Sequence, residues 1–188
     1  KYGERFRAYR ENYRKSLNYD TNGYIPDFPL TVTLELVNRC NLNCIMCYTV
    51  NHTEKKSTLG MENMKTILAE GEKHGMPALV IGLGSEPLLF KGAKDVMSQA
   101  MDNGIMDLFL ASNGVLLTED IAEFMVDNQI ARLEVSLDAA PPDTYTKIRG
   151  KKELDTVEAT LHRLIEIKKA RRPANPLLRL NFGVTEWK

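Results

Sequence analysis

Short apolar runs alternate along the chain with stretches in which apolar residues recur at every third or fourth position. The short runs are rich in Val, Leu and Ile, and their lengths predict buried β-strands. We expect five of them, at residues 30–37, 78–83, 107–111, 131–137 and 177–184. The wider spacing is typical of amphipathic helices, which we expect at residues 61–74, 94–103, 118–128, 143–148 and 153–172.

The first 29 residues have a different pattern. Four apolar side chains at helical spacing predict a further helix that packs against a larger body: Phe6, Tyr9, Tyr13 and Leu17. An Asn-Gly pair and two prolines then predict a loop over residues 21–29. We therefore expect a helical extension at 1–29 and the main domain at 30–188.

Within that domain, Ser57 or Thr58 should cap the helix that begins near residue 61, and Gly75 should end it.

The alternation of strands and helices predicts an α/β fold with a parallel sheet, because each helix returns the chain to the edge where the next strand begins. Two architectures fit this order, an open doubly wound sheet and a partial α/β barrel. Both collect their functional groups at the carboxyl ends of the strands. In this sequence the polar and glycine-rich segments follow the predicted strands, so we expect a site at that edge.

The composition is that of an ordinary globular protein, with 43% hydrophobic and 27% charged residues among 188. The 25 basic and 25 acidic residues balance, which does not favour a nucleic-acid partner. The longest apolar run, at 76–84, is far shorter than the roughly 20 residues that a membrane span requires. The charged N-terminus has no apolar signal region. We expect no membrane association.

Three cysteines lie within eight residues, at Cys40, Cys44 and Cys47. Their number is odd and their spacing is short, which predicts a metal site in a reducing compartment such as the cytoplasm. Thiolates favour iron–sulfur clusters, zinc or Cu(I). A cubane cluster held by three cysteines would keep one iron open for an outside ligand. The alternatives are a structural zinc site with His52 as fourth ligand and three plain reduced cysteines.

The spacing C-x₃-C-x₂-C, followed by the aromatic Tyr48 and preceded by the first predicted strand, resembles the signature of the radical S-adenosylmethionine (SAM) superfamily. The resemblance implies a partial TIM-like barrel. It also implies that Cys40, Cys44 and Cys47 hold a 4Fe-4S cluster whose fourth iron is chelated by the amino and carboxylate groups of SAM. Tyr48 would then stack on the adenine or form a hydrogen bond with it.

The segments after the second and third strands resemble two further motifs of that family, in the family's order. Gly84-Ser85-Glu86-Pro87 is similar to the GGEP motif, which implies that backbone carbonyls and Glu86 bind the SAM ammonium. Ser85 stands where the family has its second glycine. Ser112-Asn113-Gly114 is similar to the T-N-G segment, whose hydroxyl residue contacts the ribose.

The segment SLDAAPPDTYTKIRG, at 136–150, resembles the next motif of the family. The resemblance implies that Ser136 and Arg149 hold the methionine carboxylate, for which a guanidinium fork is well suited. Asp138 would bond the ribose or cap the following turn. The segment is most similar to members with a SPASM or twitch C-terminal extension and to the molybdenum-cofactor cyclases.

The family resemblance implies an enzyme that cleaves SAM reductively to a 5′-deoxyadenosyl radical, which takes a hydrogen atom from the substrate. A reductant such as flavodoxin or ferredoxin would supply the electron. The substrate would be a small molecule or a peptide; we favour peptide or protein modification or natural-product maturation over a sugar, nucleotide or cofactor precursor. A non-catalytic zinc or iron–sulfur binding module is the alternative class. The family barrel usually has six strand–helix units, so we expect a sixth unit and a C-terminal domain outside this chain.

Overall fold

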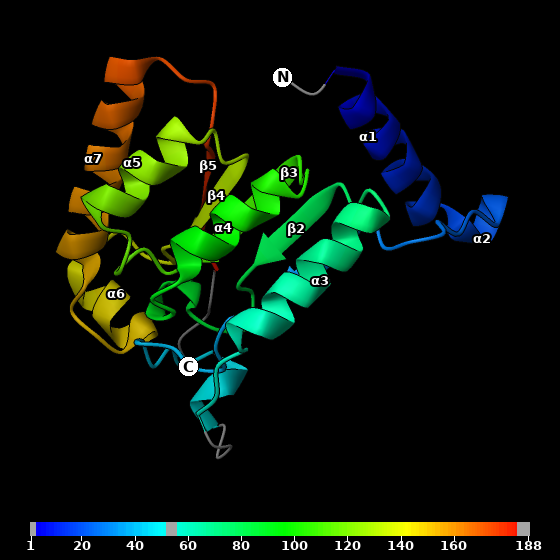
Figure 1. The fold of residues 1–188 in the computed structure, drawn as a ribbon. Coiled ribbons are helices and arrows are strands. Elements are labelled where there is room, and N and C mark those ends of the chain that lie inside the picture. The colour runs from blue at the N-terminus through cyan, green and yellow to red at the C-terminus, as the bar shows by residue number, and fades with distance from the viewer. Residues whose placement is uncertain (1–2, 52–55, 184–188) are drawn as a thin grey trace.

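Five parallel strands form one sheet in the computed structural model, which describes residues 3–51 and 56–183 (Figure 1). They are β1 (Thr31–Leu34), β2 (Ala78–Ile81), β3 (Asp107–Ser112), β4 (Arg132–Ser136) and β5 (Leu177–Asn181). Each strand pairs with its neighbours along the chain, in the order β1-β2-β3-β4-β5. A doubly wound sheet reverses its strand order partway, so this order is that of a barrel. The prediction of a partial α/β barrel is confirmed.

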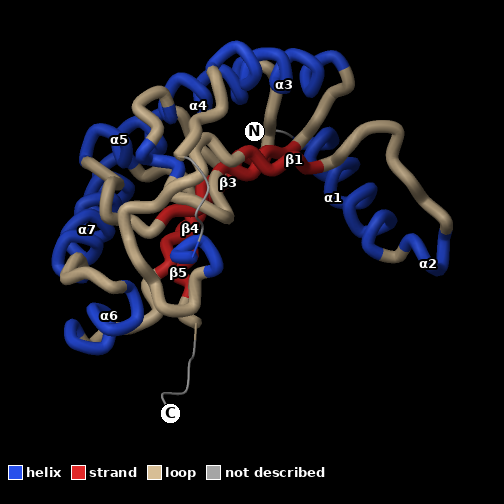
Figure 2. Tube along the Cα trace, turned by 90° about the horizontal axis from the view of Figure 1, so that it is seen from below, coloured by secondary structure: helices blue, strands red, loops and turns tan. Residues whose placement is uncertain are grey.

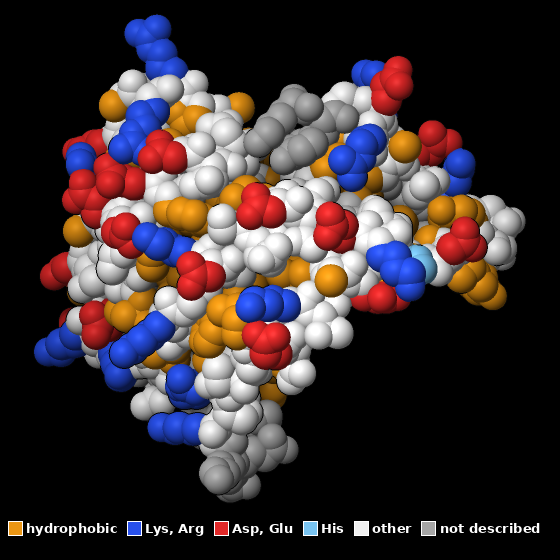
Figure 3. Space-filling view, viewed as in Figure 1, with side chains coloured by type: hydrophobic (Ala, Val, Ile, Leu, Met, Phe, Trp, Pro, Cys, Tyr) orange, Lys and Arg blue, Asp and Glu red, His pale blue; other side chains and the backbone are white. Residues whose placement is uncertain are grey.

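The helices that connect the strands cover one side of the sheet. They are α3 (Met61–Lys73), α4 (Ala93–Asp102), α5 (Glu119–Asp127), α6 (Pro142–Arg149) and α7 (Leu154–Arg171). Figure 2 shows α3, α4, α5 and α7 along the outer side of the curved sheet. None of the helices in the described ranges is long and apolar enough to cross a membrane. On the face shown in Figure 3, acidic and basic side chains are interspersed.

The main core lies between the sheet and these helices. Alternate residues of the central strands point into it and are almost fully buried: Leu79, Ile81, Leu108, Leu110, Leu133 and Val135. The intervening residues face the concave side, where several are polar. Arg132 donates two hydrogen bonds to Asp107, at 2.8 and 3.0 Å, and Arg179 Nε lies 3.3 Å from Glu134 Oε2. The inner wall of this partial barrel therefore carries ion pairs, unlike the apolar interior of a closed barrel.

The N-terminal helix α1 (Gly3–Leu17), followed by the short helix α2 (Tyr19–Asn22), packs at the opposite end of the sheet from the carboxyl ends of the strands. Tyr9 is buried against Ala78 and Met106, and its hydroxyl donates to Asp107 Oδ2 at 3.2 Å. The prediction of an amphipathic helix is confirmed, but its apolar stripe is only partly buried. Leu17 is 70% exposed, because α1 extends beyond the edge of the sheet.

Two sequence predictions about element ends are wrong. Helix α3 has Gly60 at its N-cap, and Ser57 and Thr58 do not cap it. These two residues pair instead with the segment before the first cysteine: Ser57 N donates to Asn38 Oδ1 at 2.6 Å, and Thr58 forms an antiparallel bridge with Val37. Because that segment pairs with 57–59, β1 ends at Leu34 and not at residue 37. The last strand ends at Asn181, and residue 184 lies outside the described residues.

Candidate active site

A cleft of about 410 Å³ lies at the carboxyl ends of the strands. All twelve residues singled out from the sequence line it: Cys40, Cys44, Cys47, Tyr48, Gly84, Ser85, Glu86, Ser112, Asn113, Ser136, Asp138 and Arg149. The sequence reasoning missed other residues of the wall, among them Met46, Thr49, Leu83, Glu134 and Asn181. Glu134 and Asn181 are inward-facing residues of β4 and β5, and strand alternation alone would have indicated their side of the sheet.

The cysteine loop is held at its base and along its backbone. At the base, Arg39 Nη1 donates to Ser57 O at 3.1 Å, and Leu59 N donates to Leu36 O at 3.0 Å. Further along, Asn43 N donates to Arg149 O at 3.2 Å and Ile45 N to Ile148 O at 2.9 Å. The last carbonyls of helix α6, which have no partner within a helix, therefore support the loop between the first and third cysteines.

Each of the three thiols has a polar neighbour. Leu42 N and Asn113 Nδ2 each lie 3.5 Å from Cys40 Sγ, and Arg149 Nη1 lies 3.4 Å from Cys44 Sγ. Cys47 Sγ and Thr49 Oγ1 are 2.9 Å apart. Cys40 is exposed as a residue, yet its sulfur lies in the cleft wall, and partial burial raises the pKa of the thiol. The hydrogen bonds from Leu42 N and Asn113 Nδ2 act in the opposite direction on the pKa of Cys40.

No group of three or more His, Cys, Asp or Glu side chains within residues 3–51 and 56–183, the three cysteines included, is placed to hold a metal ion. His52, the fourth ligand of the zinc alternative, lies outside the described residues.

Glu86 joins the ends of β2 and β3. It is 1% exposed, and its two carboxylate oxygens accept hydrogen bonds from Ser112 Oγ at 2.9 Å, Asn113 N at 2.8 Å and Leu88 N at 3.1 Å. Burial raises the pKa of Glu86, while these hydrogen bonds and the charge of Arg149 act in the opposite direction. A carboxylate has about four acceptor positions, so Glu86 retains one for a ligand.

Ser112 and Asn113 make most of their hydrogen bonds with the protein. Ser112 Oγ donates to Glu86 and accepts from Gly114 N at 3.0 Å. Asn113 Nδ2 donates to Asn41 Oδ1 at 2.7 Å, which connects the end of β3 to the cysteine loop. Both side chains are nearly buried, at 5% and 6% exposed. They organise the wall of the cleft, and Ser112 keeps one acceptor lone pair.

Arg149 is 6% exposed and forms a buried cluster with Asp138 and Tyr145. Arg149 Nη2 lies 2.7 Å from Asp138 Oδ2 as an ion pair that is not aligned as a hydrogen bond. Its Nε has no hydrogen-bond partner in the described part of the chain, nor does the Tyr145 hydroxyl. Asp138 has a positive φ of 63°, and its Oδ1 accepts from Gly183 N at 2.7 Å. A buried guanidinium with an unused donor is suited to an anionic ligand.

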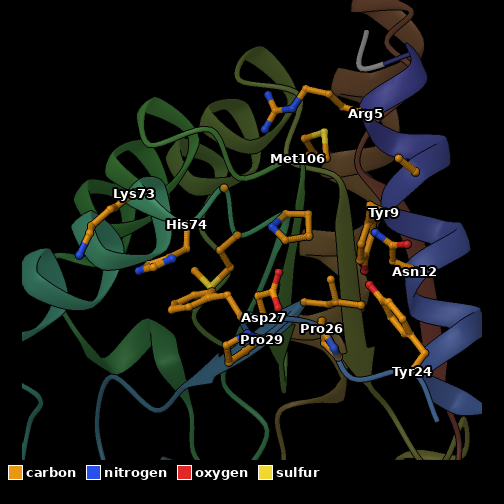
Figure 4. Close-up of a pocket in the computed structure, with 16 residues that line it drawn as sticks. Arg5, Tyr9, Asn12, Tyr24, Pro26, Asp27, Pro29, Lys73, His74 and Met106 are labelled. Carbon is orange, nitrogen blue, oxygen red and sulfur yellow. The ribbon is translucent and has the colours of Figure 1, made fainter. Parts of the chain in front are cut away.

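A second cavity of about 570 Å³ lies at the other end of the sheet (Figure 4). It is formed between α1, the segment 24–30 and the turn after α3, and its wall includes Tyr9, Asn12, Asp27 and His74. Pro77 and Met106, which directly precede β2 and β3, also line it. None of the twelve residues singled out from the sequence belongs to this cavity.

A partial parallel barrel with a cleft at the carboxyl ends of its strands has the site where barrel enzymes have theirs, and the three thiols in that cleft are of the ligand type that suits a soft metal centre. The sequence profile of the radical SAM superfamily matches residues 34–171, and the chain belongs to that superfamily. Its members are enzymes that use a 4Fe-4S cluster and SAM. The resemblance stated from the motifs is thereby confirmed.

Similar proteins include a probable GTP 3′,8-cyclase of Methanocaldococcus jannaschii, 30% identical over 138 residues, which are 73% of this chain and 46% of the relative. An AdoMet-dependent heme synthase of Methanosarcina barkeri is 32% identical over 123 residues, or 65% of this chain and 35% of the relative. The chain thus spans less than half the length of these relatives.

Among solved structures, Streptococcus suis SuiB bound to S-adenosylmethionine matches with a TM-score of 0.72 at 18% identity, covering 95% of this chain and 39% of SuiB. Native anSMEcpe with bound AdoMet matches with a TM-score of 0.65 at 18% identity, covering 82% of this chain and 43% of anSMEcpe. At this identity the two structures establish the shared fold.

Proposed function

We propose that the cleft is the SAM site of this chain, and that Cys40, Cys44 and Cys47 hold the 4Fe-4S cluster. The observation that carries the proposal is the convergence of all twelve candidate residues, from five separate segments, on one cleft. The donor set fits both groups. Three soft thiols on one loop suit an iron–sulfur cluster, and the unpartnered Nε of buried Arg149 suits a carboxylate.

Each polar group of the wall has a role in this proposal. Arg149, oriented by Asp138, would bind the methionine carboxylate together with Ser136, which lines the same cleft. Glu86 and the backbone at Gly84 and Ser85 would accept from the ammonium group.

The remaining residues would contact the nucleoside half. Ser112 would offer its free lone pair to the ribose, and Asn113 would hold the ribose side of the wall against the cysteine loop. Tyr48, which is 65% exposed, would contact the adenine. When bound, the two cofactors supply one-electron chemistry, namely reductive cleavage of SAM and abstraction of a hydrogen atom from the substrate.

A protein reductant such as flavodoxin or ferredoxin is the proposed electron donor. All three cysteines are unpaired, which supports a reducing location such as the cytoplasm.

For the substrate we propose a polar molecule, because the cleft wall beyond the candidate SAM residues carries Glu134 and Asn181. The late motif at 136–150 favours a peptide. The names of the sequence relatives, a GTP cyclase and a heme synthase, favour a cofactor precursor as the second candidate.

The test is anaerobic reconstitution of the chain with iron and sulfide, followed by reduction with dithionite in the presence of SAM. We expect about four irons per chain and formation of 5′-deoxyadenosine. The triple variant Cys40→Ala, Cys44→Ala, Cys47→Ala should give neither, and the surface variant Lys65→Ala should behave like the wild type. Equal 5′-deoxyadenosine from the triple variant would reject the proposal.

The two substrate candidates are separated by mass spectrometry after reductive turnover. A candidate peptide that loses hydrogen atoms or gains a cross-link supports the first, and a converted nucleotide or tetrapyrrole precursor supports the second.

A further inference from the structure

Glu35, which follows β1 directly, is bonded to three consecutive residues of the loop after β2. Its Oε1 accepts hydrogen bonds from Leu83 N at 2.7 Å and from Gly84 N at 2.8 Å. Its Oε2 accepts from Ser85 Oγ at 2.5 Å. Short bonds to one carboxylate from two successive amides and a hydroxyl fix the orientation of this loop.

The orientation of the amides determines where the carbonyl oxygens point. In a trans peptide unit the N–H and the C=O point in opposite directions. Glu35 holds the N–H groups of Leu83 and Gly84, so the carbonyls of Gly82 and Leu83 are turned away from Glu35. Gly82, Leu83 and Gly84 all line the cleft, so the backbone whose orientation Glu35 fixes is part of the cleft wall.

The loop is also confined by its other neighbours. A Cβ on Gly82, whose φ is +74°, would lie 2.6 Å from the Pro87 ring and 3.0 Å from Ala111 O. A Cβ on Gly84 would collide with the Tyr48 hydroxyl. The loop is therefore closely packed at Gly82, while at Gly84 it meets the tip of an exposed side chain. Within that space the Glu35 carboxylate selects the peptide orientation.

We propose that Glu35 is a positioning residue for SAM: it fixes the orientation of the loop at 82–85, whose backbone carbonyls then accept from the ammonium group of the methionine half. Ser85 completes this device, since its side chain supplies the third bond, which a glycine at that position would lack. The inference rests on the proposed function of the cleft. It assigns a role to a residue that does not itself touch the ligand.

The test compares two ligands on the reconstituted, cluster-loaded chain. SAM carries the amino acid half, and 5′-methylthioadenosine lacks it but keeps the adenosine. Affinities for both are measured by isothermal titration calorimetry. In Glu35→Ala we expect SAM binding to weaken by about tenfold or more, the effect typical of losing hydrogen bonds to a charged group. Binding of 5′-methylthioadenosine should stay within about twofold of wild type.

Two further variants distinguish the effect of loop orientation from the effect of the Glu35 charge and from a failure of the protein to fold. Glu35→Gln keeps an oxygen for the two amides and an NH₂ for Ser85 Oγ, so SAM affinity should stay within about threefold of wild type. Ser85→Gly, which removes one bond of three, should give an intermediate and SAM-selective loss. Glu62→Ala, a change at an exposed helix position, is the matched control and should alter neither affinity.

The outcomes are distinct. Equal weakening of both ligands in Glu35→Ala, no weakening of either, or a loss in Glu35→Gln as large as in Glu35→Ala would overturn the positioning role. A wild-type chain that binds iron but not SAM would reject the proposed function itself. Circular dichroism and thermal unfolding of each variant identify a variant that fails to fold, and Ser85→Gly then provides the comparison.

Discussion

Gly150 lies so close to the cysteine loop that a Cβ atom on it would be 2.7 Å from Asn43 O. Gly150 ends helix α6 with a φ of +78°, and the preceding carbonyl, Arg149 O, accepts from Asn43 N. Only glycine combines this backbone conformation with so close an approach. The contact sets the position of the loop between Cys40 and Cys44 relative to Arg149, and thus connects the candidate cluster ligands to the candidate carboxylate ligand.

Gly150→Ala should displace the cysteine loop. We expect the free energy of unfolding to fall by about 2–4 kcal/mol, from the positive φ and the steric conflict together, and iron content after reconstitution to fall below that of wild type. Gly75→Ala is the matched control, because Gly75 has a φ of +67° but no atom within 4 Å of a Cβ. It should lose only about 1–2 kcal/mol and keep its iron. Equal iron content in the two variants would contradict the structural role of the contact.

Glu86→Gln should destabilise the protein by about 1–3 kcal/mol, as measured by urea unfolding. The amide must place its NH₂ either toward Asn113 N or toward Leu88 N, and both of these are donors. One buried donor then loses its acceptor in either orientation. Glu62→Gln, at an exposed position, should change stability by less than about 0.5 kcal/mol. A Glu86→Gln variant as stable as wild type would show that this network is not formed.

Tyr145→Phe should stabilise the cofactor-free chain by about 1 kcal/mol, because the buried hydroxyl it removes has no partner in the described part of the chain. Burial raises the pKa of Tyr145 to about 12, so the phenol is neutral throughout the physiological range. Tyr13→Phe, at a partly exposed position of α1, is the control and should be neutral. Destabilisation by Tyr145→Phe in urea unfolding would mean that the hydroxyl has a bonding partner.

Asp107→Asn should loosen the attachment of helix α1. Asp107 accepts two bonds from Arg132 and one from Tyr9, and a neutral amide has a single acceptor oxygen. Arg132 remains partly exposed to water, so we expect a loss of about 1–3 kcal/mol rather than the larger cost of a fully buried pair. Limited proteolysis should cleave the first 30 residues faster. Asp120→Asn, which breaks the exposed pair with Lys94, should leave both measurements nearly unchanged.

The sequence was sufficient for the strand and helix order because the hydrophobic pattern of a sheet covered by helices is local. The apolar residues of the central strands are buried against the helices, as the hydrophobic pattern predicts; they include Leu108, Leu110, Leu133 and Val135. The candidate site could also be assembled from the sequence, since its segments follow the strands, whose carboxyl ends meet at one edge.

The sequence predictions that failed concern residues whose bonding partners are distant in the sequence. Glu35 looked like one polar position of an alternating strand, and its three bonding partners come 48 to 50 residues later. Ser57 and Thr58 have the residue types of helix caps, but Asn38, Arg39 and Val37 engage them. Leu17 lies on the apolar face of its helix, as its spacing predicts, but no other part of the described structure covers it. The spacing of apolar residues identifies the face of a helix and does not show how far the sheet extends beneath that face.

The pairing of 36–39 with 57–59 brings together the two ends of the segment that contains the three cysteines. Lengthening the chain inside such a closed segment adds only loop-closure entropy, about 0.6 kcal/mol for each doubling of its length. The two ends of the cysteine segment are therefore held together whatever the length of chain between them.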